Sequence, residues 1–242
     1  MSAGDLFTDG ALFPGRLGGG YDTQVLVDSP VGYWPSSEAS GTTLFDASGN
    51  NRNLSVVGAT LGARTAFPFN LPGPDYDGND YATSSPVNWW SGVSGCAIEV
   101  WVRFDAIVAG QPGNINSIFG DLTSGNNGCL LRCDGVSGST LPLVWYLGSS
   151  SGLASTPAYN LTVDTDYHIV GSWNGTTMRL YVNGVEVRSE SHSSPATFNM
   201  ATRIASSEGG RFLDGCVHHA ALYNTPLSAA RVLAHYDTAL AA

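Results

Sequence analysis

The stretch DYHIVGSWNGTTMRLYVNGVEV, residues 166–187, constrains the fold more than any other part of the sequence. It contains three short runs of strand-forming residues separated by two turn signals, NGTT and Asn183-Gly184. An Asn-Gly pair between apolar runs is the strongest short-range signal for a two-residue hairpin turn. Strands joined by such turns pair antiparallel, so we expect an antiparallel sheet in this region.

Similar short runs recur along the chain without helical patterns between them. Residues 97–104, AIEVWVRF, alternate strongly and predict a strand. Further runs are NSIFGDL, GCLLRCD, LPLVWYLG and FLDGCVHHAALYN, separated by loops rich in Gly, Ser and Asn. Strands of this length and spacing predict an all-β sandwich or jelly roll, with Trp34, Trp101 and Trp173 in its core.

Helical signals are confined to the two ends of the predicted domain. Residues 21–36 predict a short helical turn followed by a strand. Near the C-terminus, Pro226 precedes SAARVLAHYDTAL, the one good helix pattern in the chain. Leu227, Val232 and Leu233 fall near one face of that helix, which we expect to cap the sandwich.

Composition excludes several classes of partner. The 242 residues carry a formal charge of −10, and all ten basic residues are arginines scattered singly. A chain without a basic stripe is not expected to bind nucleic acid or an anionic membrane surface. No apolar run is long enough to insert into a membrane, and the first 22 residues lack the basic and apolar regions of a signal peptide.

The chain divides into an N-terminal arm, residues 1–20, and one domain, residues 21–242. The arm is rich in glycine and ends in GRLGGG, which predicts a flexible segment. Its side chains that could anchor the domain to a partner protein are Leu6, Phe7, Leu12, Phe13 and Arg16. The alternative is that the arm folds back on its own domain.

The four cysteines are predicted to be free, buried thiols. They are Cys96, Cys129, Cys133 and Cys216. Without an export signal, disulfides are not expected, and Cys packs as a small apolar residue. A zinc site built from Cys216, His218 and His219 is a weaker alternative, because their spacing matches none of the common paired-ligand patterns.

The order of the strand and turn signatures resembles a known family. YDTQVLVDSPVGYW is followed by EASGTTLFDASGNNRN, DYDGNDYAT, AIEVWVRF, DYHIVGSWNGTTMRLYVNGVEV and FLDG…AALYNTPLSAARVLAHY. Over residues 21–240 this order resembles the laminin-G-like, concanavalin A-type jelly roll, in the form found in bacterial and phage proteins. The resemblance implies an all-β fold of two antiparallel sheets packed face to face, with one short C-terminal helix.

The resemblance also implies a function. Members of the family mostly bind glycans, proteins or other ligands, often with one calcium ion. They occur in secreted adhesins, beside glycosidases, and in phage tail and virion proteins. His218 and His219 stand where similar sequences carry an Asp-Glu pair, which puts the calcium site of that strand in doubt.

Glycosidase chemistry is not predicted. It requires two carboxylates on one face, and Glu99 stands alone among its neighbours in the strand AIEVWVRF. We expect Glu99 to be a solvated strand residue or the partner of an arginine, and the protein not to be an enzyme. A hydrolase would require a loop to bring a second carboxylate beside Glu99.

Two acidic loops are weak candidates for calcium binding. Their oxygen-bearing residues are Asp46 and Asn50 in DASGNN, and Asp75, Asp77 and Asp80 in DYDGND. Carboxylate and amide oxygens suit Ca²⁺. The same residues are favoured in plain tight turns for local reasons, and that interpretation is the stronger one. No cofactor is expected to be required.

Aromatic residues are the candidates for glycan binding, because rings stack on sugars. Trp89 and Trp90 in PVNWWSG are predicted to lie in a loop, and Trp145 and Tyr146 are adjacent in a strand, where one must face outward. The alternative for Trp89 and Trp90 is packing beneath their own loop or in a subunit interface, which is slightly favoured.

These observations lead to two functional hypotheses. The first is a non-catalytic structural module, anchored by its arm in many copies to a capsid or tail and exposed on a phage virion surface. The second is a stand-alone extracellular lectin that binds host or cell-surface glycans, with or without calcium.

Overall fold

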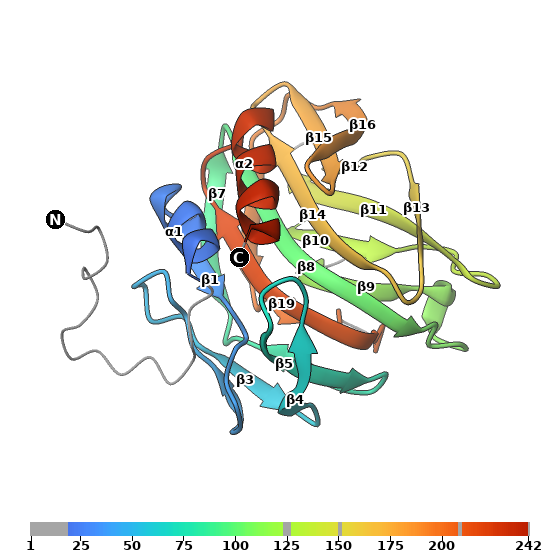
Figure 1. Ribbon diagram of the computed structural model, residues 1–242. Helices are drawn as coiled ribbons and strands as arrows, with labels where there is room; N and C mark the ends of the chain where they lie inside the picture. The colour runs from blue at the N-terminus through green and yellow to red at the C-terminus, as the bar shows by residue number, and fades with distance from the viewer. Residues whose placement is uncertain (1–18, 123–126, 150–151, 208–209, 242) are drawn as a thin grey trace, which may run out of the picture.

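The computed structural model describes residues 19–122, 127–149, 152–207 and 210–241. Two antiparallel β-sheets pack face to face (Figure 1), as the sequence predicts. The proposed anchor residues of the arm, Leu6, Phe7, Leu12, Phe13 and Arg16, lie outside the described residues.

The first sheet has the strand order β16-β15-β14-β8-β19-β5-β4, and β1 also pairs with β19. Its strands are β1 (Gly32–Trp34), β4 (Thr60–Ala66), β5 (Leu71–Asp77), β8 (Cys96–Ala106), β14 (Asp166–Trp173), β15 (Thr177–Val182), β16 (Val185–Ser191) and β19 (Asp214–Tyr223). Strands β8 and β19 pair at its centre although their partner residues are 108 or more positions apart in the sequence; their register joins Val217 to Val102 and Ala221 to Glu99.

The second sheet has the order β2-β3-β6-β18-β9-β10-β11-β17-β7, and β12 and β13 also pair with β11. Its strands are β2 (Thr43–Leu44), β3 (Leu54–Val57), β6 (Tyr81–Thr83), β7 (Val87–Val93), β9 (Asn116–Leu122), β10 (Gly128–Cys133), β11 (Thr140–Ser149), β12 (Gly152–Ser155), β13 (Tyr159–Thr162), β17 (Ala196–Met200) and β18 (Arg203–Ile204). A short 3-10 turn, η1 (Pro112–Asn114), precedes β9.

The side chains of strand β8 alternate between the two faces of the first sheet. Ile98, Val100 and Val102 point into the core between the sheets. Ala97 and Trp101 lie in a second apolar cluster on the other face. We call this second face the outer face. The alternation follows the two-residue period of a strand, and it places every second residue of AIEVWVRF away from the main core.

The predicted hairpins are present. Strands β14, β15 and β16 pair in succession. The turn between β15 and β16 has positive φ angles at Asn183 (50°) and Gly184 (78°), the backbone that an Asn-Gly turn favours. The Asn183 side chain accepts a hydrogen bond of 2.9 Å from the backbone N–H of His168, which fastens the turn to the neighbouring strand.

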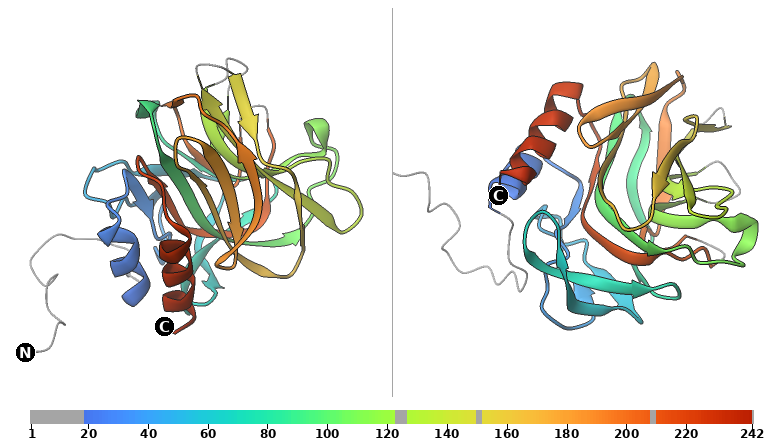
Figure 2. Two further views of the ribbon diagram at one scale, coloured as in Figure 1. Left: turned by 90° about the horizontal axis from the view of Figure 1, so that it is seen from above. Right: turned by 45° about the vertical axis from the view of Figure 1, so that its right-hand side comes forward.

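Two helices, α1 (Gly20–Val27) and α2 (Ala229–Leu240), lie side by side against the outer face of the first sheet (Figures 1 and 2). The segment predicted to be a helical turn is thus a helix of eight residues. Helix α2 begins after Ser228, whose Oγ accepts a hydrogen bond from the backbone N–H of Arg231. No helix in the described residues is both long and apolar enough to cross a membrane.

The buried face of α2 differs from the predicted one. Leu233 is 45% exposed, whereas Val232, His235 and Ala239 are buried. The helix therefore turns a histidine toward the sheet, because the outer face offers it a polar partner.

All four cysteines are buried free thiols, as predicted. Burial raises the pKa of Cys129 and of Cys216 to about 12, so these thiols remain protonated at neutral pH.

Candidate functional site

Glu99 is fully buried at the centre of the outer face, with 0% of its surface exposed. The prediction of a solvated strand residue or an arginine partner is therefore wrong. Strand periodicity directs the Glu99 side chain away from the core between the sheets, but α1 and α2 cover the position. A buried carboxylate must be hydrogen-bonded and paired with opposite charge to be tolerated.

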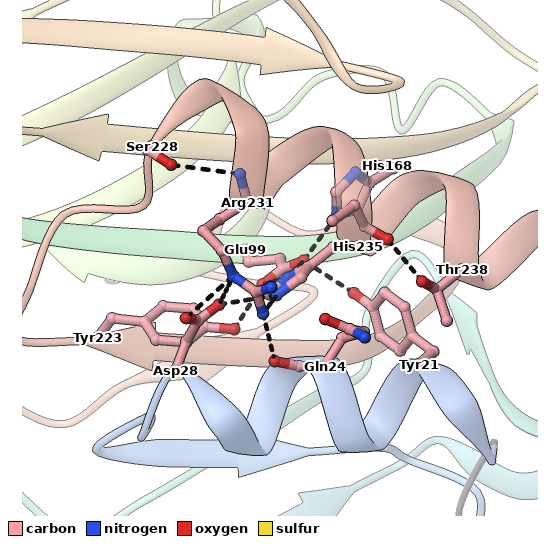
Figure 3. Close-up of polar contacts among 11 residues, drawn as sticks. Tyr21, Gln24, Asp28, Glu99, His168, Tyr223, Ser228, Arg231, His235 and Thr238 are labelled. Carbon is pink, nitrogen blue, oxygen red and sulfur yellow. Dashed lines mark hydrogen bonds and ion pairs between the residues drawn. The ribbon is translucent and has the colours of Figure 1, made fainter.

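Four side chains from four different elements surround the Glu99 carboxylate (Figure 3). Oε1 accepts hydrogen bonds from the Tyr21 hydroxyl at 2.9 Å and from His168 Nε2 at 2.7 Å. Oε2 accepts one from the Tyr223 hydroxyl at 2.5 Å. His235 Nδ1 lies 2.9 Å from Oε1 and 3.1 Å from Oε2. The carboxylate thus joins α1, β14, β19 and α2 to β8.

The network continues from His235 toward the surface. His235 Nε2 lies 2.9 Å from Oδ2 of Asp28, the residue that follows α1. Arg231 Nε donates to both oxygens of Asp28, at 3.1 and 2.9 Å. Its Nη2 donates to the Gln24 carbonyl at 3.1 Å. Two carboxylates, one imidazole and one guanidinium therefore alternate along a line that fastens α2 to α1 (Figure 3).

Electrostatics within the network favour its charged form. Burial alone raises the pKa of Glu99, but His235 and His168 outweigh burial and hold that pKa well below its usual range. Burial lowers the pKa of His235, and the carboxylates of Glu99 and Asp28 outweigh this and raise it. Burial, followed by the charge of Glu99, holds the pKa of Tyr21 and of Tyr223 well above 10. The tyrosines are therefore neutral donors to an ionised Glu99.

The two histidines of β19 lie beside this network and are also buried. Phe69 stacks on His219 with ring centroids 4.0 Å apart and an interplanar angle of 5°. Burial lowers the pKa of His218 to about 3 and that of His219 well below its usual range. Both rings are neutral at physiological pH. Cys216 does not join them in a metal site, since no group of three or more metal-ligating side chains occurs among the described residues.

An open pocket lies at one end of the same face. It has a volume of about 360 Å³ and lies between β4 and the outer face of β8, β14 and β19. We call it the β4 pocket. Its lining residues are Ala63, Arg64, Thr65, Ala66, Phe67, Arg103, Asp166, Cys216 and His218. Phe67 is 52% exposed, so the pocket combines an accessible aromatic ring with charged side chains.

A connected set of ion pairs holds the charged side chains of the β4 pocket in place. Arg103 contacts Asp105 at 3.1 Å, Asp164 at 2.9 Å and Asp166 at 3.4 Å. Arg64 pairs with Asp105 as well, so Asp105 bridges the two guanidinium groups. Burial raises the pKa of Asp166, and the nearby Arg103 opposes that shift. These pairs hold donors and acceptors in fixed positions at the pocket wall.

Comparison with protein-family models decides the family. Residues 76–233 match the model described as the concanavalin A-like lectin/glucanases superfamily. The chain belongs to this superfamily. The expected resemblance and the expected jelly-roll sandwich are both confirmed. No curated protein matches the sequence.

Several solved structures have a similar fold. Domain 4 of AbnA, a GH43 extracellular arabinanase from Geobacillus stearothermophilus in complex with arabinotriose, has a TM-score of 0.64 at 14% identity, covering 86% of this chain and 98% of that one. The binding domain of Paraclostridial Mosquitocidal Protein 1 has a TM-score of 0.67 at 15% identity, covering 88% of this chain and 53% of that one. This chain thus spans about half the length of the toxin binding domain, and identities this low show the fold alone.

The predicted glycan-binding aromatics mostly lie inside this superfamily fold. Trp89 and Trp90 are in strand β7 rather than a loop, and each is 3% exposed. Trp89 packs edge-on against Trp34, and its Nε1 donates to the Met200 carbonyl at 3.1 Å. Trp145 is fully buried. Rings packed in the core offer no face to a sugar.

Tyr146 is the exception among the four aromatics. It is partly exposed, and the guanidinium of Arg132 lies 4.3 Å from its ring centroid. Its hydroxyl donates to Asp134. Arg132 therefore covers one face of the ring, and Tyr146 lies on the second sheet, apart from the β4 pocket.

The first predicted calcium loop, DASGNN, is a turn. Asp46 accepts hydrogen bonds from the backbone N–H groups of Tyr33, Ser48 and Arg52, at 3.0, 2.9 and 2.9 Å. The Asn50 amide donates to the Val31 carbonyl at 3.2 Å. These contacts are typical of a turn-stabilising loop.

The second acidic stretch is not a loop throughout, because Asp75 and Asp77 belong to strand β5 and Asp80 follows it. Asp80 accepts a hydrogen bond of 3.3 Å from the backbone N–H of Asp77. Asp75 pairs with Arg64 at 3.1 Å. Asp75 is thus engaged by Arg64, which lines the β4 pocket.

Sequence reasoning missed the residues that the outer face brings together. Arg103 and Glu99 share the alternation of β8, so the sequence does show that both point to the same side. It carries no signal that His235, from the C-terminal helix, and Arg64, from another hairpin, reach that face.

Proposed function

We propose that this protein is a non-catalytic carbohydrate-binding module that takes a neutral glycan in the β4 pocket. The observation that carries this proposal is the combination, in one open pocket of about 360 Å³, of the exposed Phe67 ring with the side chains of Arg64, Arg103 and Asp166. Pockets for small ligands are concave, with a few convergent polar groups that fix orientation.

The chemistry of these side chains suits a sugar. Sugar hydroxyl groups both donate and accept hydrogen bonds. Guanidinium groups supply donors only, and an ionised carboxylate supplies acceptors only. The ion pairs Arg103–Asp166 and Arg64–Asp75 already hold these groups, so binding immobilises few side chains. The Phe67 ring offers an apolar surface to the C–H face of a sugar.

Relatives of the same fold support this choice of ligand class. Domain 4 of the arabinanase was solved with arabinotriose. A similar structure is that of botulinum neurotoxin type C, whose cell entry is dependent upon interaction with two ganglioside molecules; it has a TM-score of 0.62 at 14% identity over 90% of this chain and 53% of that one. These proteins share the architecture, and the transfer of ligand class to this chain is our proposal.

A non-catalytic role is favoured by the state of the carboxylates. Glu99 is enclosed and hydrogen-bonded on both oxygens, so it cannot reach a glycosidic bond. Asp105 and Asp166 at the β4 pocket are paired with arginines. A glycosidase requires one carboxyl group that gives up a proton and a second that acts as base or nucleophile. Carboxylates that are paired with arginines in this way are suited to binding a ligand rather than to transferring a proton.

A glycan array followed by calorimetry with the best-bound glycan tests the proposal. Phe67→Ala and Asp166→Asn are each expected to weaken binding about tenfold, equivalent to about 1.4 kcal/mol. Leu153→Ala removes a similarly exposed apolar side chain from the second sheet and is the matched control. Absence of any bound glycan, or equal affinities for all variants, would contradict the proposal. Repeating the titration with EDTA tests a calcium requirement.

We also propose a location for the module. Residues 1–20 attach many copies of it to a phage capsid or tail, so that the domain stands on the virion surface; an extracellular lectin is the alternative. The apolar residues of the arm support this proposal, as does the direct continuation of the arm into α1, which Tyr21 fastens to Glu99. A chain lacking residues 1–18 is expected to fold and bind glycan but not to co-sediment with virions. Unchanged co-sedimentation would contradict the anchoring role.

A further inference from the structure

The imidazole of His235 connects three elements that are far apart in the sequence. It projects from α2 and lies between the carboxylate of Glu99 on β8 and that of Asp28 after α1. The closest contact of each ring nitrogen to a carboxylate oxygen is 2.9 Å. His235 is itself fully buried. One ring therefore connects both helices to the sheet (Figure 3).

The geometry requires a proton on each ring nitrogen. A carboxylate oxygen only accepts hydrogen bonds, so Nδ1 facing Glu99 and Nε2 facing Asp28 must both be donors. Only the imidazolium form donates from both nitrogens. A neutral ring would leave a lone pair pointing at an anionic oxygen 2.9 Å away, on a ring that is itself fully buried.

We propose that α1 and α2 form a cover over the outer face that stays closed while His235 is protonated and opens as a unit when His235 loses its proton. This inference concerns the helix pair and is independent of the proposed glycan pocket. Its two helices lie against each other and contact the sheet largely through the polar network and the second apolar cluster.

Other charged and titratable groups surround His235 from both helices and the sheet. Tyr21 and Glu99 face it from α1 and β8, and Asp28 and Arg231 face it from the helix pair. His168 and Tyr223 share the Glu99 carboxylate with it. Glu99 stays ionised and the tyrosines stay neutral, for the reasons given above. Arginine remains charged throughout.

Arg231 provides an alternative partner after deprotonation. Its Nη2 lies 3.3 Å from His235 Nε2, farther than Asp28 Oδ2 at 2.9 Å. A neutral Nε2 could accept a hydrogen bond from Arg231, which would compete with the Asp28 contact. The closed network would thus be replaced by a weaker one within α2, because residues 231 and 235 share that helix.

Hydrogen–deuterium exchange of the full chain between pH 6 and 10 tests the proposal. Protection factors, corrected for intrinsic exchange at each pH, are expected to fall at least about tenfold in α1 and α2 together, in one transition centred above pH 6.5. Protection of β8 and β14 is expected to persist through that transition. A flat profile in the helices, or simultaneous loss in the sheet, would overturn the proposal.

Variants separate the role of His235 from general alkaline sensitivity. His235→Gln is expected to give weak helix protection at every pH, without the transition. Asp28→Asn keeps the contact between His235 and Glu99 but removes the second carboxylate charge, so the transition is expected to move to lower pH. This variant keeps the proposal testable if His235→Gln does not fold. His192→Gln changes a histidine outside the network and should match the parent protein. An unchanged transition in His235→Gln or in Asp28→Asn would refute the proposal.

Discussion

The Tyr21 hydroxyl lies 2.9 Å from Oε1 of Glu99, a residue 78 positions later in the chain. This hydrogen bond ties the first turn of α1 to the middle of β8. It also supplies a neutral donor to a carboxylate that has no contact with water. Helix α1 is thus held in place by Glu99, a fully buried carboxylate of the first sheet.

Removing that hydroxyl should destabilise the protein. Tyr21→Phe is expected to lower the free energy of unfolding by about 1.5–3 kcal/mol, because a hydrogen bond to a buried charged group is lost. Urea denaturation at pH 7 measures the change. Tyr159→Phe, at a partly exposed tyrosine of β13, is the control and should shift the free energy by less than about 0.5 kcal/mol. Equal effects of the two substitutions would show that the Glu99 contact is not stabilising.

Neutralising Glu99 should have a larger effect. Glu99→Gln keeps the shape of the side chain but leaves the imidazolium of His235 without its nearest buried counter-charge. The free energy of unfolding is expected to fall by about 3–5 kcal/mol, the usual consequence of breaking a buried ion pair. The pKa of His235, followed by NMR, should fall as well, and an unaltered pKa would contradict the assigned coupling.

The buried histidines of β19 should make the protein sensitive to acid. Their pKa values in the folded state are lowered, to about 3 for His218, so below pH 6.5 the unfolded chain binds more protons than the folded one. Stability is therefore present above pH 6.5 and decreases as pH falls toward 3. His235 does not oppose this trend, because its raised pKa leaves it protonated in both states below pH 6.5.

The slope of stability against pH measures this effect. Each of the two histidines should contribute about 1.4 kcal/mol per pH unit between pH 6 and 4.5. His218→Phe removes one titrating group, and urea denaturation across this range should then show about half the slope. The same slope in the variant and the parent would mean that His218 is protonated as easily in the folded state as in the unfolded one.

The inner face of β14 should tolerate no added volume at Gly171. A Cβ atom there would lie 2.4 Å from Cδ2 of Trp145, which is fully buried on β11. Gly171→Ala is expected to lower the free energy of unfolding by about 1–3 kcal/mol through overpacking. Thermal unfolding compares it with Ser189→Ala on the exposed face of β16, and similar melting temperatures for the two variants would contradict close contact between the sheets.

Much of the fold was determined by the sequence alone. The two-residue alternation of residues 97–104 placed Val100 in the core and Glu99 on the opposite face, and the Asn183-Gly184 pair located a hairpin. These are local properties: strand period and turn conformation depend on neighbouring residues along the chain, so the sequence carries them directly. The jelly roll followed from the order of such signals, and the family match agrees with it.

What covers each face was decided only by tertiary structure. Alternation shows that Glu99 points away from the main core, but not that helices from both ends of the domain bury it with His235. Likewise, Trp89 and Trp90 look like loop residues, yet the irregular pairing of β7 with β17 brings both rings inside. The physical reason is that burial and charge pairing depend on contacts between segments distant in the chain. For Glu99 and His235 that separation is 136 residues.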